Sequence, residues 1–279
     1  MSYSAEISRA NPGCFLFLID QSGSMSSPFG NSETGSSKAE ALARAINRLM
    51  SEIVIKCSKD MEIRRYFQVG VIGYGNGVGP VLGGNLVGHT LVWVDQIYEN
   101  PVRVESITKK VPDGAGGLVD STIKFPVWFD PVASGGTPMN AALSLALITL
   151  QSWVVQHPSS FPPIVINITD GESTDGDPSS SAAALRTLET NDGNLLLLNL
   201  HLSSTHGTPI LFPDNEQGLP DQYARQLFRM SSQLPDFMQQ VAREFGYNTS
   251  ANSWGFAFNA EEVEMISFLN IGTRPSNMR

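Results

Sequence analysis

The stretch that decides the fold is Phe15–Ser24, which reads Phe-Leu-Phe-Leu-Ile-Asp-Gln-Ser-Gly-Ser. Its apolar half is uninterrupted, which is typical of a strand buried on both faces in the middle of a parallel sheet. The run ends at a carboxylate, Asp20, and hydroxyl groups follow at Ser22 and Ser24. Because Gly23 lets the backbone bend, these three oxygen-bearing side chains can converge on one point. The stretch therefore predicts a buried strand that ends in a candidate cation site.

A second segment repeats this design further along the chain. Ile164–Thr169 is an apolar run that ends in Asp170 and then a glycine. A third segment, Ser-Gly-Gly-Thr-Pro at 134–138, precedes a predicted helix and supplies the hydroxyl of Thr137. Because the carboxyl ends of parallel strands lie at one edge of a sheet, where open α/β folds bind ligands, we expect the three segments to meet there.

The predicted metal ligands are all oxygen donors: Asp20, Ser22, Ser24, Thr137 and Asp170. Carboxylate and hydroxyl oxygens, with no thiolate or imidazole among them, favour Mg2+ or Mn2+ over Zn2+ or Cu2+. Each residue taken alone also fits an ordinary role, the aspartates and the threonine as helix caps and the serines as turn residues. Their joint placement at strand ends is what favours a metal site.

These segments resemble the metal-ion-dependent adhesion site of von Willebrand factor type A (VWA) domains in content and in order. The matching motifs are Asp-Gln-Ser-Gly-Ser at 20–24, Gly-Gly-Thr-Pro at 135–138 and Thr-Asp-Gly at 169–171. The resemblance implies that Ser22 and Ser24 bind the cation directly and that Thr137 does so in one of two states. It implies that Asp20 and Asp170 act mostly through coordinated water. An open coordination position would then accept an Asp or Glu of a partner protein.

Strand-like and helix-like patterns alternate along the chain, which predicts a doubly wound α/β fold with a mostly parallel central sheet flanked by helices. The expected strands after the first are Tyr66–Tyr74, Ile164–Thr169, Asn194–Leu202 and Trp254–Phe258. The expected helices run from Ser36 or Ser37 to about Ile55, Met139–Gln156, Pro178–Thr190, Asp221–Phe245 with a break at Pro235, and Ala260–Leu269. We predict a single VWA domain over residues 1–279, with a core at about 10–75 and 134–272.

Residues 76–133 form a longer connection than a compact VWA domain has between its second strand and its threonine loop. The segment has strand-like stretches at 81–94 and 117–129 and a short helical stretch at Pro101–Lys110. The resemblance therefore implies a β-rich insertion, a hairpin or a small sheet extension, near the metal edge. Some of its aromatic residues are expected to cover the sheet edge.

Composition narrows the choice of partners and compartment. With 18 basic and 27 acidic residues the net charge is −9, which disfavours binding to nucleic acid or to anionic membranes. No apolar run reaches the roughly 20 residues of a membrane span, and the first residues lack a signal-peptide pattern, so we expect a cytoplasmic protein. Cys14 and Cys57 are expected to be reduced. His201 and His206 have no cysteine or carboxylate cluster beside them, which disfavours a zinc site.

Binding, rather than catalysis, is the predicted function. A subtilisin-like protease would need its nucleophile where Pro138 stands, and a haloacid-dehalogenase-type enzyme would need an acid where Ser22 stands. The chain resembles prokaryotic stand-alone VWA proteins of the tellurium-resistance-associated type, which implies work beside a PP2C-type phosphatase and a Ser/Thr kinase, in phosphorylation signalling or in stress and defence responses. The alternatives are a structural subunit with a purely stabilising metal and, with less support, a metal-dependent hydrolase.

Overall fold

A mixed, mostly parallel sheet forms the centre of the molecule in the computed structural model, which describes residues 3–29, 35–112, 117–202 and 208–274. The strands of this sheet, in spatial order, are β13 (Ile210–Leu211), β14 (Phe256–Ala260), β12 (Leu196–Leu202), β9 (Ile164–Thr169), β1 (Gly13–Asp20), β4 (Phe67–Tyr74) and β5 (Val78–Pro80), with β6 (Val92–Trp93) also paired to β4. The strands from β14 to β4 are parallel, and the short edge strands are antiparallel.

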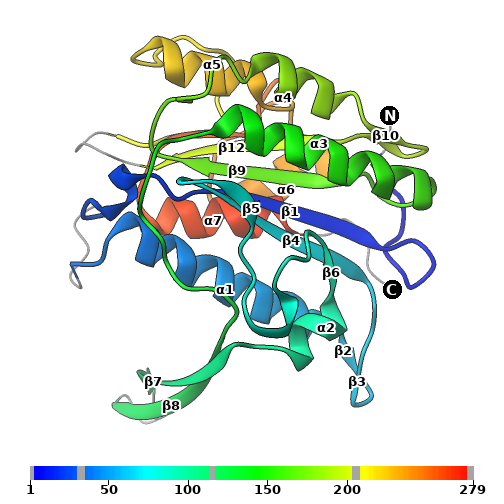
Figure 1. Cartoon of the computed structure of the whole chain (residues 1–279), viewed down its shortest axis with the longest axis vertical. Coiled ribbons are helices and arrows are strands. Elements are labelled where there is room, and N and C mark those ends of the chain that lie inside the picture. Colours follow the sequence, from blue (N-terminus) through cyan, green and yellow to red (C-terminus); the bar gives the residue numbers. More distant parts are fainter. Residues whose placement is uncertain (1–2, 30–34, 113–116, 203–207, 275–279) are drawn as a thin grey trace.

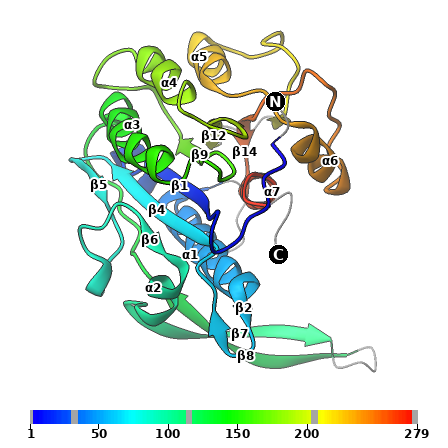
Figure 2. The same cartoon turned by 90° about the vertical axis from the view of Figure 1, so that its right-hand side faces the viewer.

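Helices cover both faces of this sheet, as Figures 1 and 2 show. One face packs against α1 (Lys38–Cys57), α6 (Asp236–Glu244) and α7 (Glu262–Gly272), and the other against α3 (Met139–Gln156), α4 (Ser179–Arg186) and α5 (Gln222–Met230). Strand β1 contributes side chains to the apolar core on both faces of the sheet. Phe15 and Phe17 belong to the cluster on the first face, and Leu16 and Leu18 belong to the cluster on the other. Every residue of β1 is buried, so the predicted α/β fold class and the central position of this strand are confirmed.

The first helix begins where its sequence provides a cap. The Ser37 hydroxyl accepts a hydrogen bond from Glu40 N at 3.2 Å, and the Glu40 carboxylate accepts one from Ser37 N at 2.8 Å. This reciprocal pair satisfies two backbone donors that the first turn of a helix leaves open. The predicted start at Ser36 or Ser37 is therefore confirmed, and the helix continues two residues past the expected end, to Cys57.

Helix α3 is long and apolar enough to match a membrane span by length and composition, but it packs on the sheet in the same layer as α4 and α5. Its Met139, Leu143, Leu150 and Trp153 are buried in the second apolar cluster.

Residues 76–133 contain a β-hairpin together with smaller elements. The hairpin is β7 (Arg103–Pro112) paired with β8 (Leu118–Val127), and it is preceded by η2 (Gly84–Leu86) and α2 (Val94–Glu99). The helix expected at Pro101–Lys110 was wrong, because β7 pairs with β8 over all ten of its residues and this cross-strand pairing outweighs local helical propensity. In both views the hairpin lies beyond α1, on the side of that helix away from the sheet (Figures 1 and 2).

Trp128, just after the hairpin, anchors this segment to the domain. Its ring nitrogen donates to Ile97 O at 2.7 Å, and its backbone N–H donates to Asn47 Oδ1 of α1 at 2.8 Å. Its side chain is fully buried. The remaining short elements are η1 (Gly23–Ser26), the pair β2 (Ser58–Lys59) and β3 (Glu62–Ile63), and the pair β10 (Glu189–Thr190) and β11 (Gly193–Asn194).

Candidate functional site

The carboxylate of Asp20 stands at the end of β1 and is held on both oxygens. Ser22 N donates to Oδ1 at 2.8 Å, and the Thr169 hydroxyl, at the end of the neighbouring strand β9, donates to Oδ2 at 2.7 Å. Only 1% of the residue is exposed. Burial raises the pKa of Asp20, the hydrogen bonds from Ser22 and Thr169 lower it, and the nearby Asp170 charge raises it further. The net shift is upward, because burial outweighs the hydrogen bonds that Asp20 accepts.

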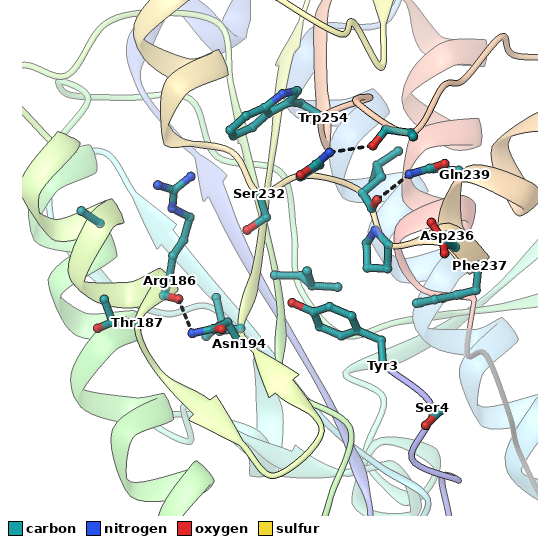
Figure 3. A pocket seen from close by; sticks show the side chains of 17 residues that line it. Tyr3, Ser4, Arg186, Thr187, Asn194, Ser232, Asp236, Phe237, Gln239 and Trp254 are labelled. Carbon is teal, nitrogen blue, oxygen red and sulfur yellow. Dashed lines mark hydrogen bonds between the residues drawn. The ribbon is translucent and has the colours of Figure 1, made fainter. Parts of the chain in front are cut away.

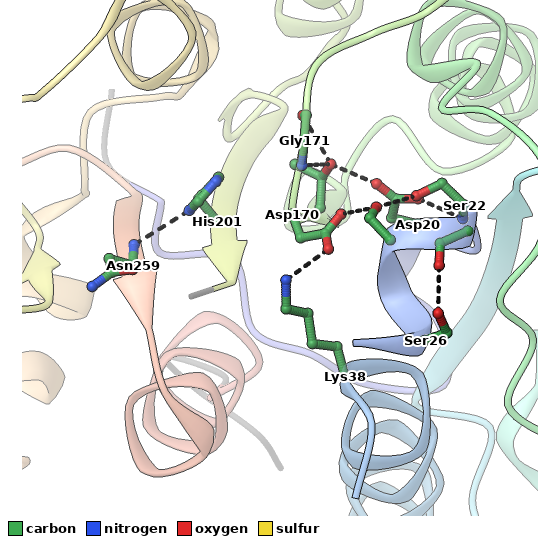
Figure 4. Close-up of polar contacts among 11 residues, drawn as sticks. Asp20, Ser22, Ser26, Lys38, Asp170, Gly171, His201 and Asn259 are labelled. Atoms are coloured by element: carbon green, nitrogen blue, oxygen red, sulfur yellow. Dashed lines mark hydrogen bonds and ion pairs between the residues drawn. The ribbon is translucent and has the colours of Figure 1, made fainter. Parts of the chain in front are cut away.

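The two serine hydroxyls lie side by side, as the alternate spacing predicted. The turn η1 brings Ser22 Oγ to 2.9 Å from Ser24 Oγ, and Ser24 Oγ donates to Asp170 Oδ1 at 2.6 Å. This chain of contacts joins the end of β1 to the end of β9 across 146 positions of sequence. The structure therefore brings Asp20, Ser22, Ser24 and Asp170 together at the carboxyl edge of the parallel strands (Figure 4).

Asp170 also makes a buried ion pair that the sequence reasoning missed. Lys38 Nζ, from the first turn of α1, lies 2.7 Å from Asp170 Oδ2, and the two side chains are only 2% and 0% exposed. Figure 4 shows the ammonium reaching the carboxylate from the helix below. A signal was present in the sequence, because Lys38 stands four residues before Leu42 and eight before Ile46, on the apolar face of α1.

Thr137 lies on a loop that is tied to the other two segments through the backbone. Gly23 N donates to Gly135 O at 3.1 Å, and Thr174 N, in the loop after Asp170, donates to Thr137 O at 2.9 Å. Thr137 is 5% exposed. The structure thus places the threonine loop against both of the loops that carry the carboxylates, as expected from the motif order.

Two glycines allow these loops to pack closely. A Cβ at Gly75, just after β4, would lie 2.6 Å from Ser134 O and 2.7 Å from Gln21 O. At Gly135, where φ is +87°, a Cβ would lie 2.5 Å from Asn76 N. A side chain at either position would push the threonine loop away from the end of β1.

The further acidic residues of this neighbourhood bind the backbone. Asp175 accepts hydrogen bonds from Asn140 N at 3.0 Å and Ala141 N at 2.8 Å, in the first turn of α3. Asp177 accepts one from Ser179 N at 2.9 Å, at the start of α4. These contacts satisfy open N–H groups of two helices, so both carboxylates act as helix caps.

His201, at the end of β12, faces the same edge without joining the oxygen cluster. Its ring stacks on Phe258 with centroids 4.6 Å apart, and its Nδ1 accepts a hydrogen bond from Asn259 N at 3.4 Å. Burial lowers the pKa of His201 to about 4, the charge of Asp170 opposes this, and that of Lys38 adds to it. The imidazole is therefore neutral at pH 7, and His206 lies outside the described residues.

The donor set suits a small hard cation. Within the described ranges no group of three or more His, Cys, Asp or Glu side chains could hold a metal. A metal at this edge would therefore depend on hydroxyl oxygens as well as on the two carboxylates, which is a combination that Mg2+ and Mn2+ accept and that Zn2+ disfavours. The hydroxyl pair of Ser22 and Ser24, next to two fixed carboxylates, fits that requirement.

A separate hollow lies in another part of the described structure. A cavity of about 1250 Å³ opens near the start of β12, at the opposite edge of the sheet from Asp20 (Figure 3). Several of its polar groups bond within the protein. The Arg186 side chain donates to Ser231 O, the Arg186 carbonyl accepts from the Asn194 side chain, and Gln239 donates to Leu234 O at 2.8 Å. The charged and hydroxyl-bearing cluster, and not this cavity, is the candidate site.

Comparisons with known proteins identify no family. No protein-family model and no curated protein matches the sequence. Similar solved structures include the manganese-loaded TRAP protein of Plasmodium vivax, with a TM-score of 0.42 and 14% identity, over 93% of this chain and 72% of that one. The pilus adhesin RrgA of Streptococcus pneumoniae has a TM-score of 0.32 and 15% identity, over 61% of this chain and 22% of its own. The minor pilin PilB of Streptococcus sanguinis has a TM-score of 0.31 and 12% identity, over 58% of this chain and 30% of the PilB chain.

The chain thus spans less than a third of either pilus protein. Likeness at this level carries no functional argument.

Proposed function

We propose that this chain is a divalent-metal-dependent protein-binding module that captures an acidic side chain of a partner protein. Mg2+ or Mn2+ would be held by the oxygen atoms of Asp20, Ser22, Ser24, Thr137 and Asp170. The observation that carries the proposal is the contact chain from Ser22 through Ser24 to Asp170, with oxygens 2.9 and 2.6 Å apart. When bound, the ion would supply a coordination position that can exchange water for a carboxylate oxygen.

The chain's own residues prepare the site before any ligand arrives. The Thr169 hydroxyl and the Ser22 backbone fix the orientation of Asp20, and Lys38 fixes that of Asp170. Rigid donors reduce the entropy that binding costs. The two carboxylates and three neutral hydroxyls would leave a coordination position of the ion to water, which the carboxylate of an incoming Asp or Glu can displace.

The metal half of the proposal is tested by thermal melting in EDTA and in Mn2+. The wild type is expected to melt at a higher temperature with Mn2+, because an ion that binds only the folded state stabilises it. Asp20→Ala should abolish the rise, and Asp177→Ala, which removes a carboxylate from the same edge outside the cluster, should keep it. Equal rises in the wild type and in Asp20→Ala would refute the site.

The binding half needs a partner, and co-purification from cells is the way to find one. Capture should be lost in EDTA and in Thr137→Ala, because both remove ligands of the proposed ion. The partner classes to examine first are a PP2C-type phosphatase and a Ser/Thr kinase, which would place the chain in phosphorylation signalling or a stress response. A pull-down unchanged by both treatments would assign the partner to another surface.

A purely stabilising metal is the second candidate, and the burial of the site favours it. Asp20, Ser22, Thr137 and Asp170 are between 1% and 8% exposed, so Ser24 is the one proposed ligand that is itself exposed. If removing the metal lowers the melting temperature and leaves partner capture intact, this second function replaces the first. Catalysis is not proposed, because Pro138 and Ser22 stand where the two enzyme classes need reactive groups.

A further inference from the structure

The buried ammonium of Lys38 adds a positive charge to a site proposed for a cation. Asp170 accepts the Ser24 hydroxyl on one oxygen, at 2.6 Å, and Lys38 Nζ on the other, at 2.7 Å. The ammonium and the proposed ligands therefore share one carboxylate. Both side chains of the ion pair are almost completely buried, so water screens this charge poorly.

Charge counting shows what this does to a metal. Asp20 and Asp170 together carry two negative charges, which would neutralise a divalent ion. With Lys38 the same site carries a net charge of −1, so a divalent ion leaves it at +1 until a further carboxylate arrives. The ammonium thus works against the metal and in favour of an acidic ligand.

We propose that Lys38 is a built-in counter-cation that weakens metal binding by the empty site and couples it to capture of an acidic group. This inference rests on the proposed function, because it assumes that the oxygen cluster binds a metal. By linkage, the factor by which the bound ion raises the affinity for the acidic ligand is also the factor by which the bound ligand raises the affinity for the ion. The site would then hold its metal weakly alone and tightly in the complex.

The position of Lys38 supports a specific role for its charge. It is the first residue of α1, next to the Ser37 cap, where the positive end of the helix dipole disfavours a cation. The other basic residue of the helix with a comparable stem, Lys56, is exposed in the last turn, where a cation is favourable. A lysine buried at the unfavourable end is explained by what its ammonium meets there, which is Asp170.

The test is titration calorimetry with Mn2+ as the probe, on the wild type, Lys38→Met, Lys38→Arg and Lys56→Met. Lys38→Met keeps the length of the side chain and removes the charge, and it should bind Mn2+ on the order of tenfold or more tightly. Lys38→Arg keeps the charge and should not bind more tightly. Lys56→Met removes the same charge at the other end of α1, about 27 Å away, and should match the wild type.

A second measurement adds acetate as a carboxylate probe. Acetate should raise the Mn2+ affinity of the wild type by a larger factor than that of Lys38→Met, because only the wild type has the ammonium of Lys38 beside the ion. An equal factor in both proteins would overturn the coupling. Equal or weaker Mn2+ binding by Lys38→Met would overturn the whole inference while leaving the metal site intact.

The failure of this inference is distinguishable from that of the proposed function, because no Mn2+ binding by either the wild type or Lys38→Met, with or without acetate, refutes the latter directly. If Lys38→Met does not fold, the comparison moves to Asp170→Asn and Asp170→Asn/Lys38→Met, which lack the Asp170 carboxylate that Lys38→Met alone would leave without its ammonium partner. The double variant should again bind Mn2+ more tightly than the single one, and the opposite order would refute the role of Lys38.

Discussion

Replacing Asp170 with Asn probes the buried ion pair that positions the site. The two side chains have nearly the same shape, and the amide oxygen of asparagine can still accept the hydrogen bond that Ser24 donates. What disappears is the negative charge that faces Lys38 Nζ at 2.7 Å, with both groups almost fully buried. Loss of one member of such a pair typically costs about 3–5 kcal/mol, because a buried charge loses its counter-charge.

The expected change in melting temperature follows from the size of the chain. For 279 residues the entropy of unfolding is roughly 0.6 kcal/mol/K, so Asp170→Asn should melt about 5–9 °C below the wild type. The assay is differential scanning calorimetry in EDTA, so that no divalent ion contributes. The matched control is Asp177→Asn. In the wild type the Asp177 carboxylate accepts a hydrogen bond from Ser179 N at the surface, so its replacement should shift the melting midpoint by about 2 °C or less.

A double variant decides whether the charge itself causes the loss. Asp170→Asn/Lys38→Met replaces the ion pair with two neutral groups, and such replacements are often close to neutral in stability. We expect it to recover much of the loss caused by Asp170→Asn. A single variant that melts within about 1 °C of the wild type, or a double variant less stable than both singles, would refute the energetic role of the pair.

Three further predictions concern residues around the site. Because burial lowers the pKa of His201 to about 4, the free energy of unfolding should fall by up to about 3 kcal/mol as the pH drops from about 6.5 to 4. Urea unfolding at several pH values should show this fall, and the fall should be smaller in His201→Asn. Asp175→Ala should cost about 1 kcal/mol in urea unfolding, through the lost cap of α3, and a cost near zero would contradict the capping role. Burial raises the pKa of the Cys14 thiol, and it raises that of Cys57 to about 12, so a thiol reagent should modify both only at the rate of unfolding; fast labelling of the native protein would contradict their burial.

The local patterns were sufficient to predict the main elements. Ile164–Thr169 and Met139–Gln156 have the expected bounds, because an uninterrupted apolar run favours a buried strand and a long Ala/Leu-rich segment favours a helix. The pattern failed at Pro101–Lys110, where β7 forms. There the partner strand β8 follows β7 after a short connection, and the cross-strand pairs that it provides cannot be read from the pattern within residues 101–110 alone.

At the site, the sequence determined which oxygen donors stand at strand ends, because apolar runs that stop at Asp20 and Asp170 show where the strands stop. The tertiary structure decided that these donors meet, through the parallel pairing of β1 with β9 and the contact of Ser24 with Asp170. It also decided that Lys38 belongs to the cluster. A lysine in the first turn of an amphipathic helix is ordinarily a solvated surface charge, and only the packing of α1 beneath the strand ends buries this one against a carboxylate.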